Sequence, residues 1–274
     1  MSRNKKIYMS KVSKQIFLSK FRNRFEHHLI DEIVIGLDTE KPYPIDGSDS
    51  SKGTVTLVPV THMPGAVMFL FKVGDKNILY TGDFVIEPED IQTLAALHEN
   101  GSPIRIDLLY YDATFDNLPT LLNRGTCIEN ICVVIQRWLD IAVDNKFWIH
   151  TNYEYAYEDL LDGISRNLNV KIRIMEKKRR SIYRQIFENA DDIYTDDENA
   201  RIIHYIHYKD KPPSRTRCIT VTAKGSSANE MQFPTHCSKS QLDEFFNYFG
   251  VEANRRVPFK KYSPGENNTN FWSI

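Results

Sequence analysis

The sequence contains no apolar run that approaches the ~20 residues needed to cross a bilayer. Its start carries basic residues, but lysine and serine interrupt the apolar positions throughout, so it does not match a signal peptide. Internal repeats and low-complexity segments are also lacking, which excludes a repeat array. We therefore expect an intracellular protein that has no membrane partner.

Cysteine is scarce, and neither sign of charge dominates. The cysteines are scattered and form no C-x-x-C clasp, which predicts reduced thiols in the core at Cys127, Cys132, Cys218 and Cys237. The formal net charge is −1, so a nucleic-acid partner would have to be held by a local basic face. The apolar fraction of 41% is ordinary for a soluble globular chain, so composition alone indicates no chemistry.

Apolar patterns predict how the chain is organised. Strands are expected at Thr54–Val60, Ala66–Val73 and Ile78–Thr81, and turn residues mark positions 41–44 and 46–51. From residue 107 onward strands alternate with helices, which predicts an α/β layer with mostly parallel strands. A last helix is expected after a capping-box pair, Ser238 and Gln241, with an irregular tail beyond it.

Three potential metal ligands come directly after predicted strands: His62, Asp83 and His236. Strand ends are rigid, so their side chains can be aimed at a common point. Each residue also has a simpler interpretation, because a lone histidine is more often a satisfied structural side chain and a Gly-Asp pair is more often a turn. Spacing alone does not decide between these interpretations.

The segment Val55–Phe84 combines two motifs in a fixed order. His-Met-Pro-Gly and Met-Phe-Leu-Phe come first, and Leu-Tyr-Thr-Gly-Asp-Phe follows. Shorter matching stretches are Ile7–Ser10, Tyr111–Phe115, Tyr155–Glu158 and Phe233–Phe245. These segments together resemble the metallo-β-lactamase/β-CASP DNA repair nucleases of the Artemis and Apollo type, and the Artemis branch more than the Apollo branch. The resemblance covers residues 6–258.

The resemblance implies a zinc site. It assigns His62 and Asp83 to zinc, with Asp83 bridging if two ions bind, and it assigns His236 to the second ion. It also assigns Asp112 to the acidic position that supports the site. Catalytic roles go to Asp83, Asp112 and His236. One or two zinc ions held by imidazole and carboxylate could activate water for hydrolysis of a phosphodiester.

One family motif is not found in the sequence given. A His-x-His-x-Asp-His run should precede the step matched by Ile7–Ser10 and supply most of the other ligands. The pair His27–His28 follows the wrong segment, and we expect it on a surface helix. With two or three ligands left, zinc should bind weakly. We therefore expect an N-terminally truncated chain that is inactive or weakened.

The fold expected from the resemblance is α/β, a metallo-β-lactamase αββα sandwich that is incomplete at its N-terminus and interrupted by a β-CASP α/β insertion. The first part of the sandwich is expected at residues 1–84 and the insertion at 85–225. The returning segment is expected at 226–258 and an irregular tail at 259–274.

DNA ends, hairpins or overhangs are the partners that the resemblance implies. The candidate DNA contacts are Thr114, Lys177, Lys178, Arg179 and Arg180. The basic run also has a simpler interpretation as a solvated helix start. End-joining or cross-link-repair proteins are further expected partners, and the expected location is the nucleus.

Three functions stay open on the sequence. The first is a metal-dependent 5′ exonuclease or structure-specific endonuclease in double-strand-break or interstrand cross-link repair. The second is a non-catalytic relative that acts as a DNA- or partner-binding module. The third is an RNA-processing β-CASP nuclease, although the Met-Phe-Leu-Phe and Tyr-Thr-Gly-Asp-Phe motifs favour the DNA branch.

Overall fold

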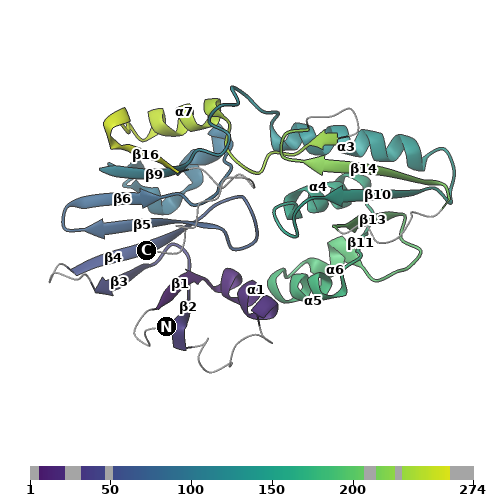
Figure 1. Ribbon diagram of the computed structural model, residues 1–274, viewed down its shortest axis with the longest axis horizontal. Helices are drawn as coiled ribbons and strands as arrows, with labels where there is room; N and C mark the ends of the chain where they lie inside the picture. The colour runs from purple at the N-terminus through teal and green to yellow at the C-terminus, as the bar shows by residue number, and fades with distance from the viewer. Residues whose placement is uncertain (1–5, 22–31, 47–51, 207–213, 226–229, 260–274) are drawn as a thin grey trace, which may run out of the picture.

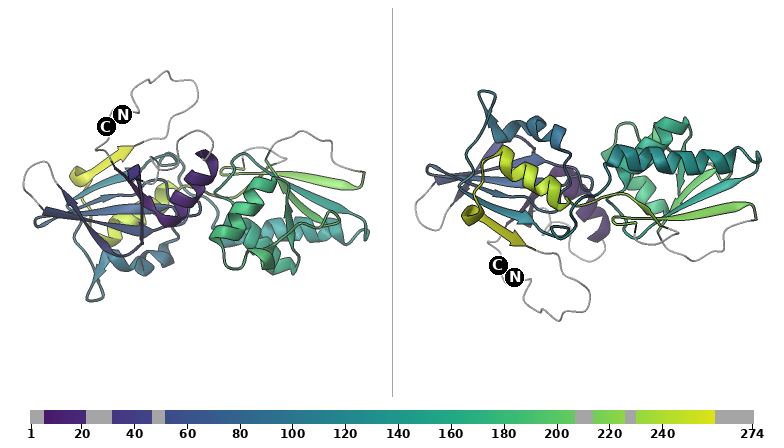
Figure 2. Two further views of the ribbon diagram at one scale, coloured as in Figure 1. Left: turned by 90° about the horizontal axis from the view of Figure 1, so that it is seen from below. Right: turned by 90° about the horizontal axis from the view of Figure 1, so that it is seen from above.

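The computed structural model describes residues 6–21, 32–46, 52–206, 214–225 and 230–259. Two six-stranded sheets form two lobes that lie side by side (Figure 1). The two lobes are also separate in the two further views (Figure 2). The protein is thus of the mixed α/β class that the sequence predicts. Among the described residues, none of the helices has the length and apolarity to cross a membrane. His27–His28 lies outside the described residues.

The first sheet is an antiparallel meander extended by two parallel strands, in the order β16-β9-β6-β5-β4-β3. Its strands are β3 (Pro42–Asp46), β4 (Lys52–Pro59), β5 (Val67–Val73), β6 (Lys76–Tyr80), β9 (Leu108–Asp112) and β16 (Arg256–Phe259). Alternation along the strands buries Met68, Leu79 and Leu109 in a core shared with Phe245. That core is closed by α7 (Lys239–Tyr248), η1 (Pro88–Thr93) and η2 (Ala95–Leu97).

Two strands of this sheet differ from the sequence-based expectation. Residues 41–44 were expected to form a turn, but Pro42 and Pro44 lie in β3. This strand is at the edge of the sheet, where proline costs no ladder hydrogen bond. The irregular tail was expected from residue 259, but Phe259 ends β16, which pairs in parallel with β9. Residues 260–274 lie outside the described part of the chain.

The second sheet is parallel throughout, as the alternation of strands and helices predicts. Its strands are β10 (Lys146–Thr151), β11 (Ile172–Ile174), β12 (Tyr194–Thr195), β13 (Ile202–Tyr205), β14 (Thr216–Thr222) and β15 (Glu230–Gln232). Phe147 and Ile149 share one core with the helices, whereas Trp148 on the opposite face packs with Tyr205. The helices are α3 (Arg124–Leu139), α4 (Glu158–Leu168), α5 (Lys177–Ile186) and α6 (Ala190–Ile193).

A small N-terminal unit completes the described structure. β1 (Ile7–Ser10) leads into α1 (Lys11–Phe21), and β1 pairs in parallel with β2 (Val34–Leu37). A short hairpin of β7 (His98–Glu99) and β8 (Ser102–Pro103) and the 3-10 helix η3 (Ala253–Arg255) are the remaining elements. Helix α1 contacts α5, so this unit touches both lobes.

The chain crosses between the lobes at positions that differ from the expected insertion limits of 85 and 225. β9 ends at Asp112 and belongs to the first sheet through its pairing with β6. β15 ends at Gln232 and belongs to the second sheet. Strands that pair across many intervening residues carry no local signal of the sheet they join, so the crossing points could not be located from the pattern. The two crossing segments meet at an isolated β-bridge between Phe115 and Ser238.

The cysteines are free among the described residues, and three of the four are buried. Cys218 is the exception to the expected core placement, because it is exposed on β14. Alternation along this strand buries Ile219 and Val221 and turns Cys218 away from the helices. The capping box expected at Ser238 and Gln241 is present at the start of α7.

Ala156 adopts an unusual backbone conformation just before α4. Its φ is 90°, in the half of the Ramachandran plot that favours glycine. Its amide donates to Oε2 of Glu158 at 2.8 Å, which holds the strained residue in place. We expect Ala156→Gly to raise the free energy of unfolding by about 1 kcal/mol, because the backbone strain is relieved. Urea unfolding checks this. The control is Ala113→Gly, because Ala113 is buried and does not have a positive φ. This variant should instead lower the free energy of unfolding.

Candidate metal centre

His62 lies in the turn between β4 and β5. The turn is fixed at both ends: the amide of Val85 donates to the carbonyl of Thr61 at 2.8 Å, and the carbonyl of Gly65 accepts from Ser10 Oγ at 2.7 Å and Ser13 Oγ at 2.9 Å. The N-terminal unit therefore holds the turn that carries the first imidazole.

Gly65 is required by both conformation and space. Its φ is +82°, and a Cβ atom there would lie 2.7 Å from the amide nitrogen of Ser13. We expect Gly65→Ala to lower the free energy of unfolding by about 2–4 kcal/mol, because strain and a backbone clash add up. The control is Gly74→Ala, where φ is +60° and nothing lies within 4 Å. That variant should lose only about 1 kcal/mol. Equal losses in urea unfolding would contradict the proposed clash.

Asp83 follows the end of β6. Gly82 has a φ of +59°, so the chain can turn sharply and present the carboxylate at the sheet edge. A backbone hydrogen bond from the amide of Cys237 to the carbonyl of Phe84, 3.0 Å long, ties this segment to the one that carries His236. These backbone links explain why three distant segments meet at one place.

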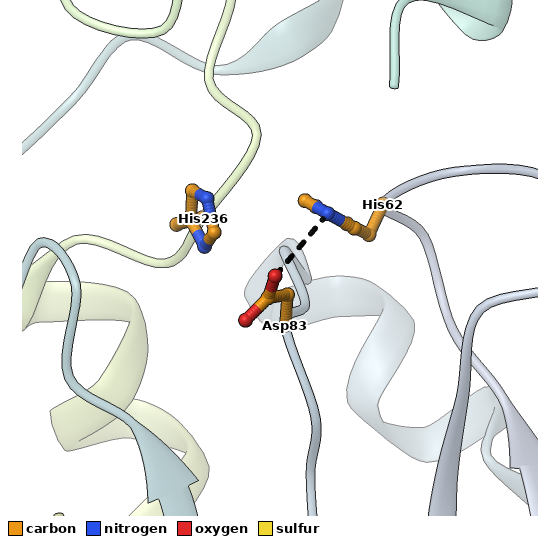
Figure 3. A group of neighbouring side chains, drawn as sticks. All are labelled: His62, Asp83 and His236. Carbon is orange, nitrogen blue, oxygen red and sulfur yellow. Dashed lines mark ion pairs between the residues drawn. The ribbon is translucent and has the colours of Figure 1, made fainter. Parts of the chain in front are cut away.

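The structure brings His62, Asp83 and His236 together. One ligand atom from each residue lies within 4.8 Å of the others. The imidazole centroids of His62 and His236 are 5.0 Å apart, and Nε2 of His62 is 3.7 Å from Oδ2 of Asp83. Figure 3 shows the three side chains pointing toward one another, from the turn, the sheet edge and the returning segment. The sequence predicts this convergence.

Hydrogen bonds set the tautomer of both imidazoles. Nδ1 of His62 is 2.8 Å from the carbonyl oxygen of Thr235, which can only accept, so Nδ1 carries the proton. Nδ1 of His236 is 2.6 Å from Oδ2 of Asp112. In the neutral form of each ring, these contacts leave the lone pair on Nε2, which is the state that a metal ion requires.

Asp112 is the support of His236 rather than part of the three-residue group. It is only 2% exposed and receives hydrogen bonds from the amide and hydroxyl of Thr114, at 2.9 and 2.5 Å. Burial acts to raise the pKa of Asp112, but the hydrogen bonds from His236 and Thr114 outweigh it and lower the pKa below its usual value. The carboxylate is therefore ionised, and it orients His236.

The five candidate DNA contacts have different surroundings. Thr114 donates to Asp112, as described above. Arg179 is 1% exposed and donates to the carbonyl of Glu154 at 2.9 Å, and Arg180 pairs with Asp196 at 2.6 Å. Lys177 and Lys178 are exposed at the start of α5. Of the basic run, these two lysines are therefore the side chains that face solvent.

Two supporting groups were not singled out from the sequence. Thr81 is fully buried, and its hydroxyl accepts from the amide of Asp112 at 3.1 Å. The carbonyl of Thr235 orients His62. Each of these threonines comes shortly before a candidate ligand, but a backbone carbonyl leaves no signal in a sequence. Only the folded chain shows these contacts.

The fit to a divalent metal ion rests on the donor set. Two imidazoles and a carboxylate are typical zinc ligands, and here their ligand atoms lie within 4.8 Å of one another. A cavity of about 210 Å³ opens beside His62, and its lining includes Met63, Arg124 and Asp159. A group of candidate ligands therefore lies next to a cavity.

Comparisons with known proteins agree with these motifs. No family model matches the sequence. The curated protein artemis of Rattus norvegicus is 25% identical over 88% of this chain and 39% of its own length. Protein artemis of Danio rerio is 28% identical over 89% of this chain and 43% of its own length. The 5′ exonuclease Apollo of Mus musculus is 27% identical over 60% of this chain and 28% of its own length.

The chain thus spans less than half of the length of these relatives. A crystal structure of a protein of unknown function from Enterococcus faecalis V583 has a TM-score of 0.64 at 14% identity. It covers 93% of this chain and 70% of that chain, which supports a shared fold. In sequence, the chain is thus similar to the Artemis and Apollo group of metallo-β-lactamase/β-CASP DNA repair nucleases, and more so to artemis than to Apollo.

Proposed function

We propose that this protein is a zinc-dependent nuclease that hydrolyses DNA phosphodiesters in DNA repair, as a 5′ exonuclease or a structure-specific endonuclease. The observation that carries the proposal is the convergence of His62, Asp83 and His236 with both histidines held as Nδ1–H tautomers. The relatives named artemis and Apollo support DNA as the substrate. A nuclear location and DNA ends, hairpins or overhangs as partners belong to the same proposal.

The donor set favours zinc. Catalytic zinc sites commonly use three protein ligands, two of them histidine and one a carboxylate, with a fourth position left open. His62, Asp83 and His236 match that number and type. A zinc ion held there would supply Lewis-acid chemistry toward a phosphodiester and the attacking water. A second ion would need ligands beyond these three.

The protein's own groups have distinct roles in this proposal. Asp112 keeps the proton of His236 on Nδ1, and the carbonyl of Thr235 does the same for His62. Asp83 brings a negative charge to the site, with Oδ2 3.7 Å from Nε2 of His62. The first lobe would be the metallo-β-lactamase part, the second lobe the β-CASP insertion, and the cleft between them the DNA site.

The test compares hydrolysis of 5′-phosphorylated DNA and matched RNA by the chain, with zinc and with a chelator. The proposal predicts hydrolysis of DNA that is slow, because the ligand set is incomplete, and that the chelator abolishes. Preferential hydrolysis of RNA would instead indicate an RNA-processing relative. Zinc binding without hydrolysis of either substrate would indicate a non-catalytic DNA- or partner-binding module, and it would contradict the proposed activity.

A further inference from the structure

We propose that Lys224 holds a backbone phosphate of the nucleic-acid strand, on the side of the metal site formed by His236. This binding role rests on the proposed function, because it places the same substrate at the same site. It adds a specific contact and an orientation: the strand lies over the His236 side and stays away from the His62 side.

A continuous set of contacts connects Lys224 to the metal site. The ammonium nitrogen of Lys224 lies 5.1 Å from the centroid of the Phe115 ring. The ring of Phe115 meets the imidazole of His236 edge to face, with 5.2 Å between centroids. Phe115 is 6% exposed, whereas Lys224 is exposed. The cation therefore lies at the surface, one aromatic ring away from a proposed ligand.

The backbone that carries Lys224 is fixed. The side chain of Gln232 donates to the carbonyl of Lys224 at 3.1 Å and accepts from the amide of Leu122, also at 3.1 Å. The amide of Gly225 donates to Oγ1 of Thr222 at 2.9 Å. Gln232 thus links this turn to the segment between Phe115 and α3. A lysine on a fixed backbone loses less entropy when it binds a phosphate than one on a mobile loop.

Gly225 shows how closely the turn is packed. Its φ is +60°, and a Cβ atom there would lie 2.8 Å from the amide nitrogen of Gln232. The turn therefore approaches β15 at backbone distance, and the position of the Lys224 Cα is set by this packing. The contact of its side chain with Phe115 follows from that placement.

The other side of the site has the opposite charge. A cavity of about 640 Å³ begins at Thr61, next to His62, and carboxylates dominate its ionisable lining. These are Glu87, Glu89, Asp90 and Asp159. The cavity also contains Arg124, but its guanidinium pairs with Asp159 at 2.9 Å. Like charges repel, so a phosphate backbone is disfavoured there and the strand is directed to the Lys224 side.

The experiment measures binding of the full chain to a fluorescein-labelled single-stranded DNA oligonucleotide, by anisotropy in a chelating buffer at several salt concentrations. Lys224→Ala should weaken binding about three- to tenfold at low salt. It should also make the slope of log binding constant against log salt concentration shallower by about 0.7, as the loss of one phosphate contact does. Lys224→Arg should keep both. Two controls, Lys72→Ala on the exposed part of β5 and Glu89→Gln in the acidic cavity, should leave binding nearly unchanged.

An equal loss in Lys72→Ala, or no measurable binding by the unaltered chain, overturns the inference. If Glu89→Gln raised the DNA affinity as much as Lys224→Ala lowered it, the strand would lie near the acidic cavity. That result would also contradict the inference. Because binding is measured without hydrolysis, the two proposals fail separately. Lys224-dependent binding without hydrolysis contradicts only the proposed activity, whereas hydrolysis without Lys224 dependence contradicts only this inference.

Discussion

Asp83→Asn is expected to weaken zinc binding by more than about a hundredfold, because changes to groups outside the ligand shell already cost about 10–100-fold. The change keeps the shape of the side chain and removes the charge that lies 3.7 Å from Nε2 of His62. An imidazole that binds a metal ion adds no charge, so a divalent ion would lose its one anionic ligand among the three. Competition with a chromophoric chelator measures the zinc affinity.

The matched control for this variant is Asp75→Asn. Asp75 lies at the exposed turn between β5 and β6, on the same hairpin that ends beside Asp83. It should leave the zinc affinity unchanged. If Asp83→Asn bound zinc as tightly as the unaltered chain, Asp83 would not be a ligand.

Asp112→Asn is expected to weaken zinc binding about 10–100-fold, although Asp112 is not one of the three proposed ligands. The carboxylate holds Nδ1 of His236 at 2.6 Å and makes the ring a better ligand through Nε2. An amide of the same shape cannot accept this proton as strongly, so the ring loses both orientation and basicity. The same chelator competition gives the affinity, and far-ultraviolet circular dichroism shows whether the variant folds.

Asp107→Asn separates this effect from a general loss of stability. Asp107 immediately precedes β9, whereas Asp112 ends it, and Oδ2 of Asp107 accepts a hydrogen bond from the amide of Asn77 at 3.0 Å. Its loss should lower the stability of the first sheet and leave the zinc affinity of the folded protein intact. Equal zinc affinities for the two variants would show that Asp112 does not act through His236.

The convergence of the three candidate ligands could be predicted because strand ends and motif residues coincide. His62, Asp83 and His236 come shortly after strands with apolar patterns, and the resemblance assigned all three to metal. The spacing of apolar residues along β5 and along the helices of the second lobe is a local property of the chain. Burial of one face of each element fixes these patterns, so they are visible without a structure.

Long-range contacts explain what the sequence did not reveal. β16 gains its stability from pairing with β9, more than a hundred positions earlier, and its four residues carry no clear strand pattern. Arg179 belongs to a solvated-looking basic run, but the fold buries it against Glu176 and the carbonyl of Glu154. A basic helix start and a buried guanidinium have the same local sequence. Only the neighbouring segments decide which of the two is formed.

The most direct test of the account is the amount of zinc bound to the folded chain after dialysis, measured by elemental analysis beside His236→Ala. With excess zinc in the dialysis buffer, which the incomplete ligand set requires, the account predicts a stoichiometric ion in the unaltered chain and a large loss in the variant, because ligand atoms of His62, Asp83 and His236 lie within 4.8 Å of one another. A folded chain that stays free of zinc, or a variant that retains as much as the unaltered chain, would contradict it.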